Sequence, residues 1–463
     1  MTTPRQPSGN AGFLGAIWDG LGGDSRMLPC VSSAGEGVLP SVFDVTGLAA
    51  ASVGAASLAV AELVAARTGQ APPAVAVDRR RTGLWFGWSL KPEGWTPEPP
   101  WDPIAGDYRA ADGWIRLHTN APHHRAAALA VLRTAAEKDA VAAAVAGWRA
   151  DELEAAVVAA GGCAATMRSL EDWAAHPQGR AAAAEPLVAW ESAGAGGRDA
   201  ARAFDPARPL AGIRVLDLTR ILAGPVATRF LAGFGAEVLR IDPPGWEEPS
   251  VVPEVTLGKR CARLDLRDSA GRARLLALLA EADVLVHGYR PGALEGLGLG
   301  AEARRAARPG LVEVTLDAYG WSGPWAGRRG FDSLVQMSAG IAEAGMLRLG
   351  RERPTPLPVQ ALDHATGYLM AAAAARGLTG RLAHGRGCTA RLSLARTAAL
   401  LASRPAPEQP DAPARPEPAD YAPEIEVTPW GPAHRLRPPA AIAGIPLRWD
   451  RPAAALGSSP PEW

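Results

Sequence analysis

The second half of the chain alternates short apolar runs with longer segments of helical character, and this alternation predicts its fold. The apolar runs predict four buried strands, at residues 213–218, 236–242, 283–287 and 310–316. One predicted helix opens at Gly224-Pro225 and continues to about Gly233, and another runs from Ser269 to Glu281. Strands that alternate with helices are typical of a parallel, doubly wound sheet. We therefore predict an α/β fold with a Rossmann-like sheet, whose ligand lies beyond the carboxyl ends of the strands.

The first half has a different pattern. An Ala-rich helix is predicted from about Leu48 to Arg67, followed by a strand near residues 74–78 and an irregular stretch rich in Trp and Pro at residues 85–103. A hairpin is predicted at residues 107–118, and Ala-rich helices continue to about Pro206. This half therefore predicts a smaller α+β lobe beside the sheet.

The last part of the chain changes composition again. Residues 405–423 are rich in Pro, Asp and Glu and predict a stiff, poorly packed linker. Residues 430–463 regain apolar anchors and predict a segment that docks back on a lobe. Because single domains typically have ~100–200 residues, a chain of this length predicts more than one lobe. We divide the chain into an N-terminal segment (1–105), a small lobe (106–205), a Rossmann-like lobe (206–402), and a linker with docking segment (403–463).

Charge and hydropathy argue against two classes of partner. The 48 basic and 48 acidic residues give a formal net charge of zero, without a long run of one sign. This is not the charge pattern of a nucleic-acid-binding protein. The first residues, 1–23, lack the apolar core of a targeting segment, and we expect no run of the ~20 apolar residues that a membrane span needs. We therefore expect a cytoplasmic protein without a nucleic-acid or membrane partner.

Three segments of the second half carry a resemblance to a known family. Gly288-Tyr-Arg-Pro-Gly292 is similar to an Asn-Phe-Arg-Pro-Gly loop, residues 319–324 are similar to a Gly-Phe-Gly-x-x-Gly-Pro turn, and Asp363 stands at the mouth of a helix rich in small residues. From Leu210 to about Leu400 the chain resembles the family III CoA-transferases, which include carnitine dehydratase-like enzymes and α-methylacyl-CoA racemases. The resemblance implies an enzyme that moves CoA between an acyl-CoA and a carboxylic acid.

The resemblance also implies that Asp363 is the nucleophile. A carboxylate that attacks a thioester forms a mixed anhydride, and CoA then passes through an aspartyl thioester to the acceptor acid. A structural alternative is that Asp363 only caps a helix beginning at His364, a role that stabilises a helix by ~1 kcal/mol. The flanking family segments favour the nucleophile.

The contacts with CoA follow from the same resemblance. Leu222 and Ala223 stand where the family's chain passes the CoA, and Leu222 replaces a Gln found in many members. Gly288 replaces the family's Asn. Arg290 could pair with a phosphate through its planar fork, or be a solvated surface residue.

Two further segments add candidate CoA contacts. Lys259 stands in a segment like the family's Gly-Lys-Arg, and it predicts either a phosphate contact or a surface lysine. Tyr319 and Gly320 belong to a turn expected to line the acyl and pantetheine channel, or simply to close a strand–helix unit. The implied CoA contacts are Leu222, Ala223, Lys259, Gly288, Tyr289, Arg290, Tyr319 and Gly320, and no metal is implied.

The small lobe precedes the sheet here, whereas in ordinary family members it follows the Asp-bearing helix. Either a circular permutation or a tandem whose first copy lost its front half would give this order. The predicted helix from about Leu48 and the strand at residues 74–78 look like a second copy of the Asp363 helix and its following strand, which favours the truncated tandem. In that copy Ala50 stands where Asp363 stands, although Asp44 lies nearby. Family members form interlocked dimers, so this chain could form a homodimer or fulfil part of that arrangement internally.

Other activities remain open. A racemase needs an acid/base group on each side of the α-carbon, and racemases of this family carry a His in the segment that matches Gly330-Phe331-Asp332. Phe331 cannot transfer a proton, and His364 points in another direction from Asp363 at a helix start. We therefore favour the transferase. The alternatives are an α-methylacyl-CoA racemase, a CoA-dependent dehydratase, or a catalytically silent CoA-binding homologue.

Two other candidate sites are weaker. Residues 215–242 mimic a dinucleotide-binding unit, but the GxGxxG fingerprint is absent. His118, His123 and His124 could suggest a metal, but Cys or carboxylate partners are missing at ligand spacing. We expect these histidines to be surface or packing residues.

Overall fold

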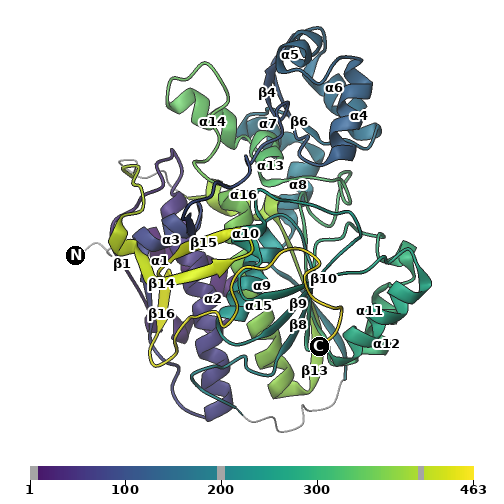
Figure 1. Cartoon of the computed structure of the whole chain (residues 1–463). Coiled ribbons are helices and arrows are strands. Elements are labelled where there is room, and N and C mark those ends of the chain that lie inside the picture. The colour runs from purple at the N-terminus through teal and green to yellow at the C-terminus, as the bar shows by residue number, and fades with distance from the viewer. Residues whose placement is uncertain (1–8, 196–203, 405–410) are drawn as a thin grey trace, which may run out of the picture.

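The computed structural model of the protein describes residues 9–195, 204–404 and 411–463. Its centre is a seven-stranded sheet in the order β10-β9-β8-β11-β12-β13-β7, in which the first six strands are parallel and β7 is antiparallel to β13 (Figure 1). The predicted α/β class with a mostly parallel sheet is confirmed. The strands are β8 (Arg214–Leu218), β9 (Glu237–Asp242), β10 (Lys259–Arg263), β11 (Val284–His287), β12 (Val312–Asp317), β13 (Arg386–Ser393) and β7 (Ala189–Ala195).

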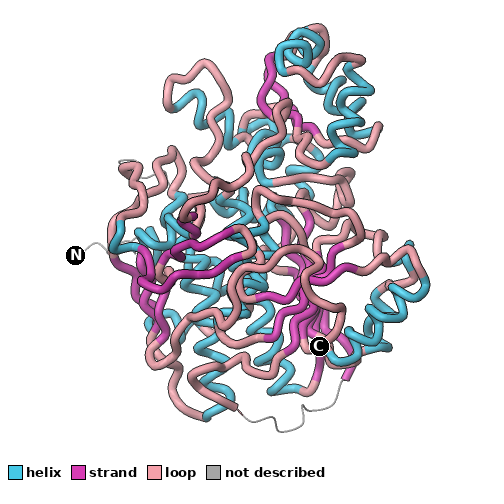
Figure 2. The backbone as a smooth tube through the Cα atoms, viewed as in Figure 1, coloured by secondary structure: helices cyan, strands magenta, loops and turns pink. Residues whose placement is uncertain are grey.

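Helices cover both faces of this sheet (Figure 2). Along the strands Val215, Val238 and Val284 belong to the core that also contains α9 (Ala223–Gly233), α15 (Ala361–His384) and α16 (Leu394–Ala402). The next residues, Leu216, Leu239 and Leu285, belong to a second core with α11 (Ser269–Glu281) and α12 (Ala301–Ala307). Because successive strand residues point to opposite faces, a sheet buried on both faces needs continuous apolar runs. This is why the four runs could be recognised in the sequence.

A small lobe stands apart from the sheet, at the top of Figure 1. Its antiparallel strands β4 (Gly106–Arg109), β5 (Trp114–Leu117) and β6 (Ala164–Thr166) pack with α4 (Pro122–Leu132), α5 (Lys138–Ala146) and α6 (Ala150–Ala159). Ile115, Val141 and Leu153 are fully buried in this core. The hairpin predicted at residues 107–118 is present as β4 and β5. Helices α7 (Leu170–Ala175) and α8 (Pro177–Ala184) lead back to β7, and residues 196–203 of the predicted lobe lie outside the described residues.

The two ends of the chain build a second, smaller sheet. Strand β1 (Val31–Ala34) pairs parallel with β2 (Val75–Asp78), and β16 (Ala440–Ile442) pairs antiparallel with β2. Helix α2 (Val45–Thr68) contacts this sheet and also lies along α15. A third sheet joins β3 (Leu90–Pro92), β15 (Gly431–Leu436) and β14 (Tyr421–Thr428). The remaining elements are α1 (Gly9–Gly20), η1 (Ser25–Cys30), α3 (Arg79–Trp85), α10 (Val252–Val255), η2 (Glu295–Leu297), α13 (Asp332–Ser338), α14 (Ile341–Arg348) and η3 (Pro418–Asp420).

Helix α2 corrects one expectation from the sequence. By length and composition it is apolar enough to cross a membrane, whereas we expected no such segment. In the structure 89% of its apolar window is buried, between the small sheet and α15. A buried core helix meets the same criteria as a membrane span, so α2 gives only weak evidence for one.

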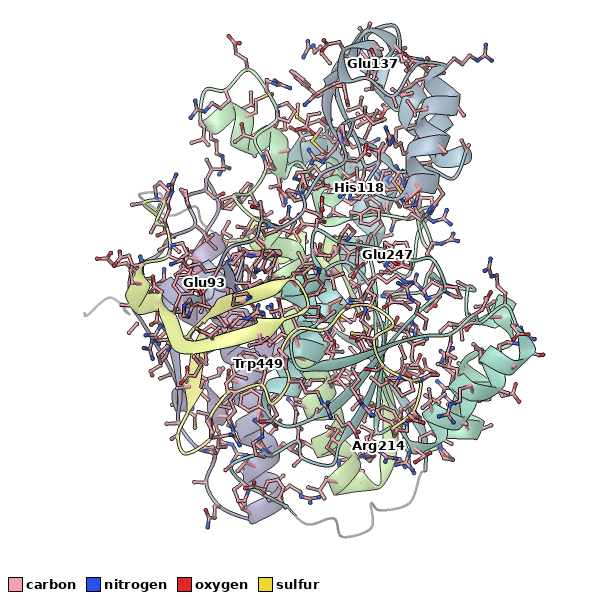
Figure 3. The ribbon with its side chains drawn as sticks, viewed as in Figure 1. Glu93, His118, Glu137, Arg214, Glu247 and Trp449 are labelled. Atoms are coloured by element: carbon pink, nitrogen blue, oxygen red, sulfur yellow. The ribbon has the colours of Figure 1, made fainter. Side chains whose placement is uncertain are left out.

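The predicted linker is exposed over most of its described length but is anchored at two points. Residues 405–410 lie outside the described residues. Beyond them, Asp411 accepts a hydrogen bond from Thr46 at the start of α2, and Asp420 pairs with Arg80 at 2.9 Å. Most residues of 411–423 are nevertheless exposed, so this stretch is held by polar contacts of its acids with the N-terminal segment and buries little of itself. Of the apolar anchors after it, Ile442, Ile445 and Leu447 are buried. Trp449 is partly buried and donates from Nε1 to the carbonyl of Arg229 (Figure 3).

The two sheets repeat one arrangement. In the large sheet β12 is parallel to β13, α15 precedes β13, and β7 is antiparallel to β13. In the small sheet β1 is parallel to β2, α2 precedes β2, and β16 is antiparallel to β2. The outer strands are exchanged, because β7 follows the β1–α2–β2 unit along the chain while β16 follows β13. A truncated tandem would leave this repetition, and a clean permutation would not.

Candidate active site

A pocket of about 420 Å³ opens at the carboxyl ends of β8, β11 and β12. It lies where the strand order reverses, between β8 and β11, which is the usual ligand position on such sheets. Its walls come from several parts of the chain. They are residues 219–223, 288–290 and 317–318 after the strands, residues 328–331 before α13, Asp363 of α15, and His123 and His124 of the small lobe.

Asp363 lies in the first turn of α15. The helix begins at Ala361 after Gln360, so the alternative of Asp363 as the cap of a helix beginning at His364 is wrong. The Asp363 N–H is one of the amides that a first turn leaves without an intrahelical acceptor, and it donates to Oδ2 of Asp332 at 2.9 Å. Asp332 also accepts from the side-chain amide of Gln336. A second carboxyl group thus holds the start of α15 in place.

The environment of these two aspartates disfavours charge. Asp332 is 1% exposed and Asp363 is 8% exposed. Burial, and then the neighbouring Asp332 carboxylate, raises the pKa of Asp363 well above its usual value. Burial also raises the pKa of Asp332 to about 6, against the opposing effect of the amides that donate to it. Asp363 therefore keeps its proton to a higher pH than an exposed aspartate does.

The N-terminus of α9 lies against the first turns of α15. A Cβ at Gly367 would collide with the carbonyl oxygen of Ala223 and lie 2.9 Å from Cβ of Val226. Only glycine permits this approach, which brings Leu222 and Ala223 to the same pocket as Asp363. A helix N-terminus presents unpaired N–H groups and a dipole that favours negative charge. These groups can stabilise an oxyanion that develops beside Asp363.

Ile221 adds a strained backbone to the pocket wall. Its φ of 65° lies in the left-handed region, which a β-branched residue rarely adopts. Its N–H donates to Glu248 at 2.9 Å, and Glu248 pairs with the buried Arg240 at 2.5 Å. Strain of this kind persists where surrounding contacts enforce it, commonly at functional sites.

Lys259 does not reach the pocket. It is 1% exposed, and its Nζ lies 2.9 Å from Asp217 and 3.0 Å from the carbonyl of Pro225. Asp217 also accepts from Thr219 and Thr228, both at 2.5 Å. The prediction of a phosphate contact or a surface lysine is therefore wrong. Lys259 forms a buried ion pair with Asp217 and a hydrogen bond with Pro225, and these contacts join β10 to β8 and the start of α9.

Tyr319 and Gly320 lie behind the pocket rather than in its wall. Tyr319 is fully buried, and its hydroxyl lies 3.2 Å from that of Ser338. Gly320 donates from its N–H to Asp317 at 2.6 Å, and a Cβ on it would face the carboxylate of Glu185. The prediction that these two residues line the channel is wrong. The turn supports the pocket through Asp317, whose pKa burial raises to about 7.

Gly288, Tyr289 and Arg290 lie in the pocket wall, and their contacts with CoA stay a prediction. Tyr289 also positions a neighbour. The guanidinium of Arg220 lies 5.4 Å from the centre of the Tyr289 ring and 5.0 Å from that of Trp246, and it donates to the Tyr289 hydroxyl at 3.1 Å. This end of the pocket is therefore built from stacked flat groups.

The histidines of the small lobe are closer to the site than the sequence indicated. His123 and His124 line the pocket. His118, where the small lobe meets the large one in Figure 3, stacks face to face on Phe331 with ring centres 3.8 Å apart. Burial lowers the pKa of His118 to about 3 and that of His124 to about 4, so both rings are neutral near pH 7. Phe331 stands at the position where a racemase of this family would carry a His, and its ring packs against His118 of the small lobe.

The structure brings six of the predicted residues to one pocket and leaves three outside it. Asp332, Ile221 and Glu248 were missed. Asp332 could have been found, because it stands in the family segment with Phe331, whereas Ile221 and Glu248 depend on contacts that the sequence does not reveal. Within the described part of the chain, no group of three His, Cys, Asp or Glu side chains could hold a metal ion. The pocket residues are Asp363, Leu222, Ala223, Gly288, Tyr289 and Arg290, and those outside are Lys259, Tyr319 and Gly320.

Comparisons with known proteins match the second half of the chain to a known family. Residues 210–427 match the family model described as CoA-transferase family III. The chain is 34% identical over 195 residues, covering 39% of this chain and 49% of the relative, to a probable fatty acyl-CoA transferase, Rv3272, of Mycobacterium tuberculosis. It is 34% identical over 198 residues, covering 40% of this chain and 44% of the relative, to a succinyl-CoA:glutarate CoA-transferase of Mus musculus.

A crystal structure of Rv3272 is 31% identical with a TM-score of 0.37, covering 42% of this chain and 57% of that one. The chain thus spans about half the length of the curated relatives that it matches.

Proposed function

Starting from residues 210–427 as a member of CoA-transferase family III, we propose that the protein is an enzyme that moves CoA between an acyl-CoA and a carboxylic acid. The observation that carries the proposal is the position of Asp363. Its carboxyl group lies in the pocket, beside the N-terminus of α9 and against Asp332. The two relatives are named for different substrates. One name gives a fatty acyl-CoA, and the other gives succinyl-CoA and glutarate, so the names do not identify the substrate of this chain.

The first half of the proposed reaction breaks the thioester of the donor. An oxygen of ionised Asp363 attacks the thioester carbonyl carbon, the C–S bond breaks, and CoA leaves as its thiolate. The product is a mixed anhydride between Asp363 and the acyl group. The thiolate then attacks the Asp363 carbonyl of this anhydride, which releases the donor acid as a carboxylate and leaves an aspartyl-CoA thioester.

The second half runs the same steps with the acceptor. The acceptor carboxylate attacks the aspartyl carbonyl, CoA thiolate leaves, and a second anhydride forms. Thiolate attacks the acyl carbonyl of that anhydride, which regenerates the Asp363 carboxylate and releases the new acyl-CoA. Each attack creates an oxyanion, and N–H groups at the start of α9 are the donors that the pocket offers for it.

The pocket also explains why a shielded aspartate suits this chemistry. Water would hydrolyse an anhydride, and the burial that raises the pKa of Asp363 limits the access of water. Because Asp363 must lose its proton before it attacks, turnover should rise as the pH passes the pKa of Asp363. Leu222, Ala223, Gly288, Tyr289 and Arg290 are the residues that we propose to contact CoA.

Covalent trapping tests the proposal. The protein is incubated with an acyl-CoA and hydroxylamine, digested, and analysed by mass spectrometry. We expect a hydroxamate on Asp363, and none on Asp44, the acid at the start of α2. CoA binding without a hydroxamate would instead support a silent homologue, and exchange of the α-proton with deuterium from solvent would support a racemase.

A further inference from the structure

The turn that leads from β8 to α9 forms one wall of the pocket. It consists of residues 219–222, between the end of the strand and the start of the helix. Thr219 is fixed by Asp217, which accepts from its N–H at 2.9 Å and from its hydroxyl at 2.5 Å. Two residues later, Ile221 has the left-handed φ of 65°. The chain therefore enters α9 through one strained residue.

Glu248 holds this strained residue from behind the pocket wall. One of its oxygens accepts the Ile221 N–H at 2.9 Å and the Trp246 indole N–H at 3.0 Å, and Arg240 pairs with the other oxygen at 2.5 Å. Glu248 is 6% exposed, and it is not one of the described residues that line the pocket. Because both of its oxygens are bound by groups of the protein, Glu248 acts on the pocket only through the residues that it holds.

The segment that carries Glu248 is itself tied to α9. The Glu248 carbonyl accepts from the N–H of Val251 at 3.0 Å, just before α10 begins. Glu254 of α10 forms a buried ion pair with Arg229 of α9, and Arg229 also donates to the Glu254 carbonyl at 3.0 Å. Hydrogen bonds of this kind are strengthened by burial. The position of Glu248 relative to α9 is thus fixed before any ligand binds.

We propose that Glu248 is a positioning residue of the transferase, which keeps Ile221 left-handed and thereby holds the N–H groups at the start of α9 where the oxyanion develops. The inference rests on the proposed function, because that function assigns the oxyanion to these groups. Leu222 and Ala223 stand at this start and line the pocket, and a first helical turn leaves its N–H groups without intrahelical acceptors. Without Glu248, Ile221 relaxes to a negative φ, since a β-branched residue is strained at a positive one. The peptide groups that follow then change direction.

The rate of covalent trapping tests the role of Glu248. Four proteins are compared: the wild type, Glu248→Ala, Ile221→Gly, and the variant with both changes. Each is mixed with hydroxylamine and the acyl-CoA that labels Asp363, and hydroxamate formation is followed over a range of acyl-CoA concentrations. Glu248→Ala should lower the limiting rate about 100-fold while the half-saturating concentration changes little, as expected for an interaction made mainly in the transition state.

The Ile221→Gly background decides whether this loss passes through the strained residue. Glycine adopts a positive φ without strain, so in this background Glu248→Ala should lower the limiting rate by only about 10-fold or less. A purely structural role, through the buried pair with Arg240, would give equal losses in both backgrounds and overturn the proposal. An effect on the half-saturating concentration alone would overturn it too. If the alanine variant does not fold, Glu248→Gln, which keeps the shape and one acceptor oxygen, replaces it in both backgrounds.

Glu247→Ala is the matched control, because Glu247 is the neighbouring acid, is exposed, and pairs with Arg263. It should leave the trapping rates unchanged. Hydrogen exchange measured by mass spectrometry adds a readout without catalysis. The peptide that contains Ile221 should exchange faster in Glu248→Ala than in the wild type, and Glu247→Ala should not change it. Equal exchange in all three proteins would show that Glu248 does not hold Ile221.

The two proposals can fail separately. A missing hydroxamate on Asp363 of the wild type refutes the transferase mechanism, and the exchange measurement still shows whether Glu248 holds Ile221. A hydroxamate that forms equally fast with and without Glu248 leaves the transferase intact and refutes the positioning role.

Discussion

Helices α15 and α2 are the same length and play the same part in their sheets, yet only α15 carries an acid in its first turn. Both have 24 residues and end at a glycine in the left-handed conformation, Gly385 after α15 and Gly69 after α2. When these ends are matched, Gly47 stands where Asp363 stands. From the sequence we had matched Gly54 to Gly367, which puts Ala50 at the position of Asp363. With either alignment, the first copy has no acid at this position.

The difference lies in what holds the first turn. In α15 the N–H of Asp363 donates to Asp332, which comes from another helix and leaves the Asp363 side chain free to line the pocket. In α2 the N–H of Gly47 donates at 2.8 Å to Asp44, the cap of the same helix. A Cβ at Gly47 would collide with the Asp44 carboxylate. The cap at Asp44 therefore leaves no space for a side chain at position 47, so α2 cannot carry an aspartate there. Helix α2 instead packs along α15.

The largest expected effect separates the two acids. Asp363→Ala should lower CoA transfer by about 10³-fold or more, because the covalent route is lost. Asp44→Ala should keep the transfer rate and cost about 1 kcal/mol of stability, the usual worth of an N-cap. Initial rates with an acyl-CoA and an acid, together with urea unfolding, measure both. Unchanged transfer by Asp363→Ala would sink the mechanism.

The second test compares two helix glycines. Gly367→Ala should destabilise the protein by about 1–3 kcal/mol and slow transfer, because the new Cβ pushes α15 away from the Ala223 carbonyl. Gly54→Ala introduces a Cβ 3.3 Å from a side-chain methyl of Val31, which can shift, so its change should stay within about 1 kcal/mol. Both changes add an alanine to a helix interior, so their difference isolates the approach of α9. Equal losses would show that this approach is not special to α15.

The third test concerns the acid pair that α2 lacks. Asp332→Asn keeps an oxygen that accepts the Asp363 N–H but removes the negative charge that raises the pKa of Asp363. The acidic limb of the pH–rate profile should therefore move to lower pH. Asp44→Asn is the control and should leave the profile unchanged. An unchanged acidic limb would mean that Asp332 is already neutral when Asp363 ionises.

The smallest effect is on stability. An acid whose pKa is raised by folding keeps its proton while the unfolded chain loses it, so the native state is penalised above the unfolded pKa of about 3.9. Asp363→Asn removes this penalty and should raise Tm by about 2–4 °C at pH 7.5. Near pH 3 the difference should vanish, since Asp363 is then largely protonated in both states. A lower Tm for the variant at pH 7.5 would contradict the raised pKa.

The sequence predicted the parts of the molecule that local pattern determines. The four strands and the helices between them followed from apolar runs, because both faces of the sheet are covered. Asp363 and the loop at Gly288 followed from short motifs. The burial of Lys259 could not be predicted. Its ion-pair partner Asp217 lies on another strand, and the sequence of the motif does not distinguish a buried lysine from an exposed one.

Contacts between distant segments account for the other errors. Tyr319 was assigned to the channel because its turn resembles a family motif, but the carboxylate of Glu185 and the core behind the turn hold it away from the pocket. The stacking of His118 on Phe331 joins two lobes. The pairing of β16 with β2 also escaped prediction, since short strands far apart in sequence carry no pairing signal.

The exchanged outer strands have a consequence for synthesis of the chain. Strand β2 emerges from the ribosome early, but its antiparallel neighbour β16 comes more than 300 residues later, as the positions Val75 and Ala440 show. Until then one edge of the first sheet has unpaired N–H and C=O groups, which can pair with another chain. Strand β13, by contrast, is made after β7 is already available. The edge of β2 therefore stays open to wrong pairing for much longer during synthesis than the edge of β13 in the sheet that carries the pocket.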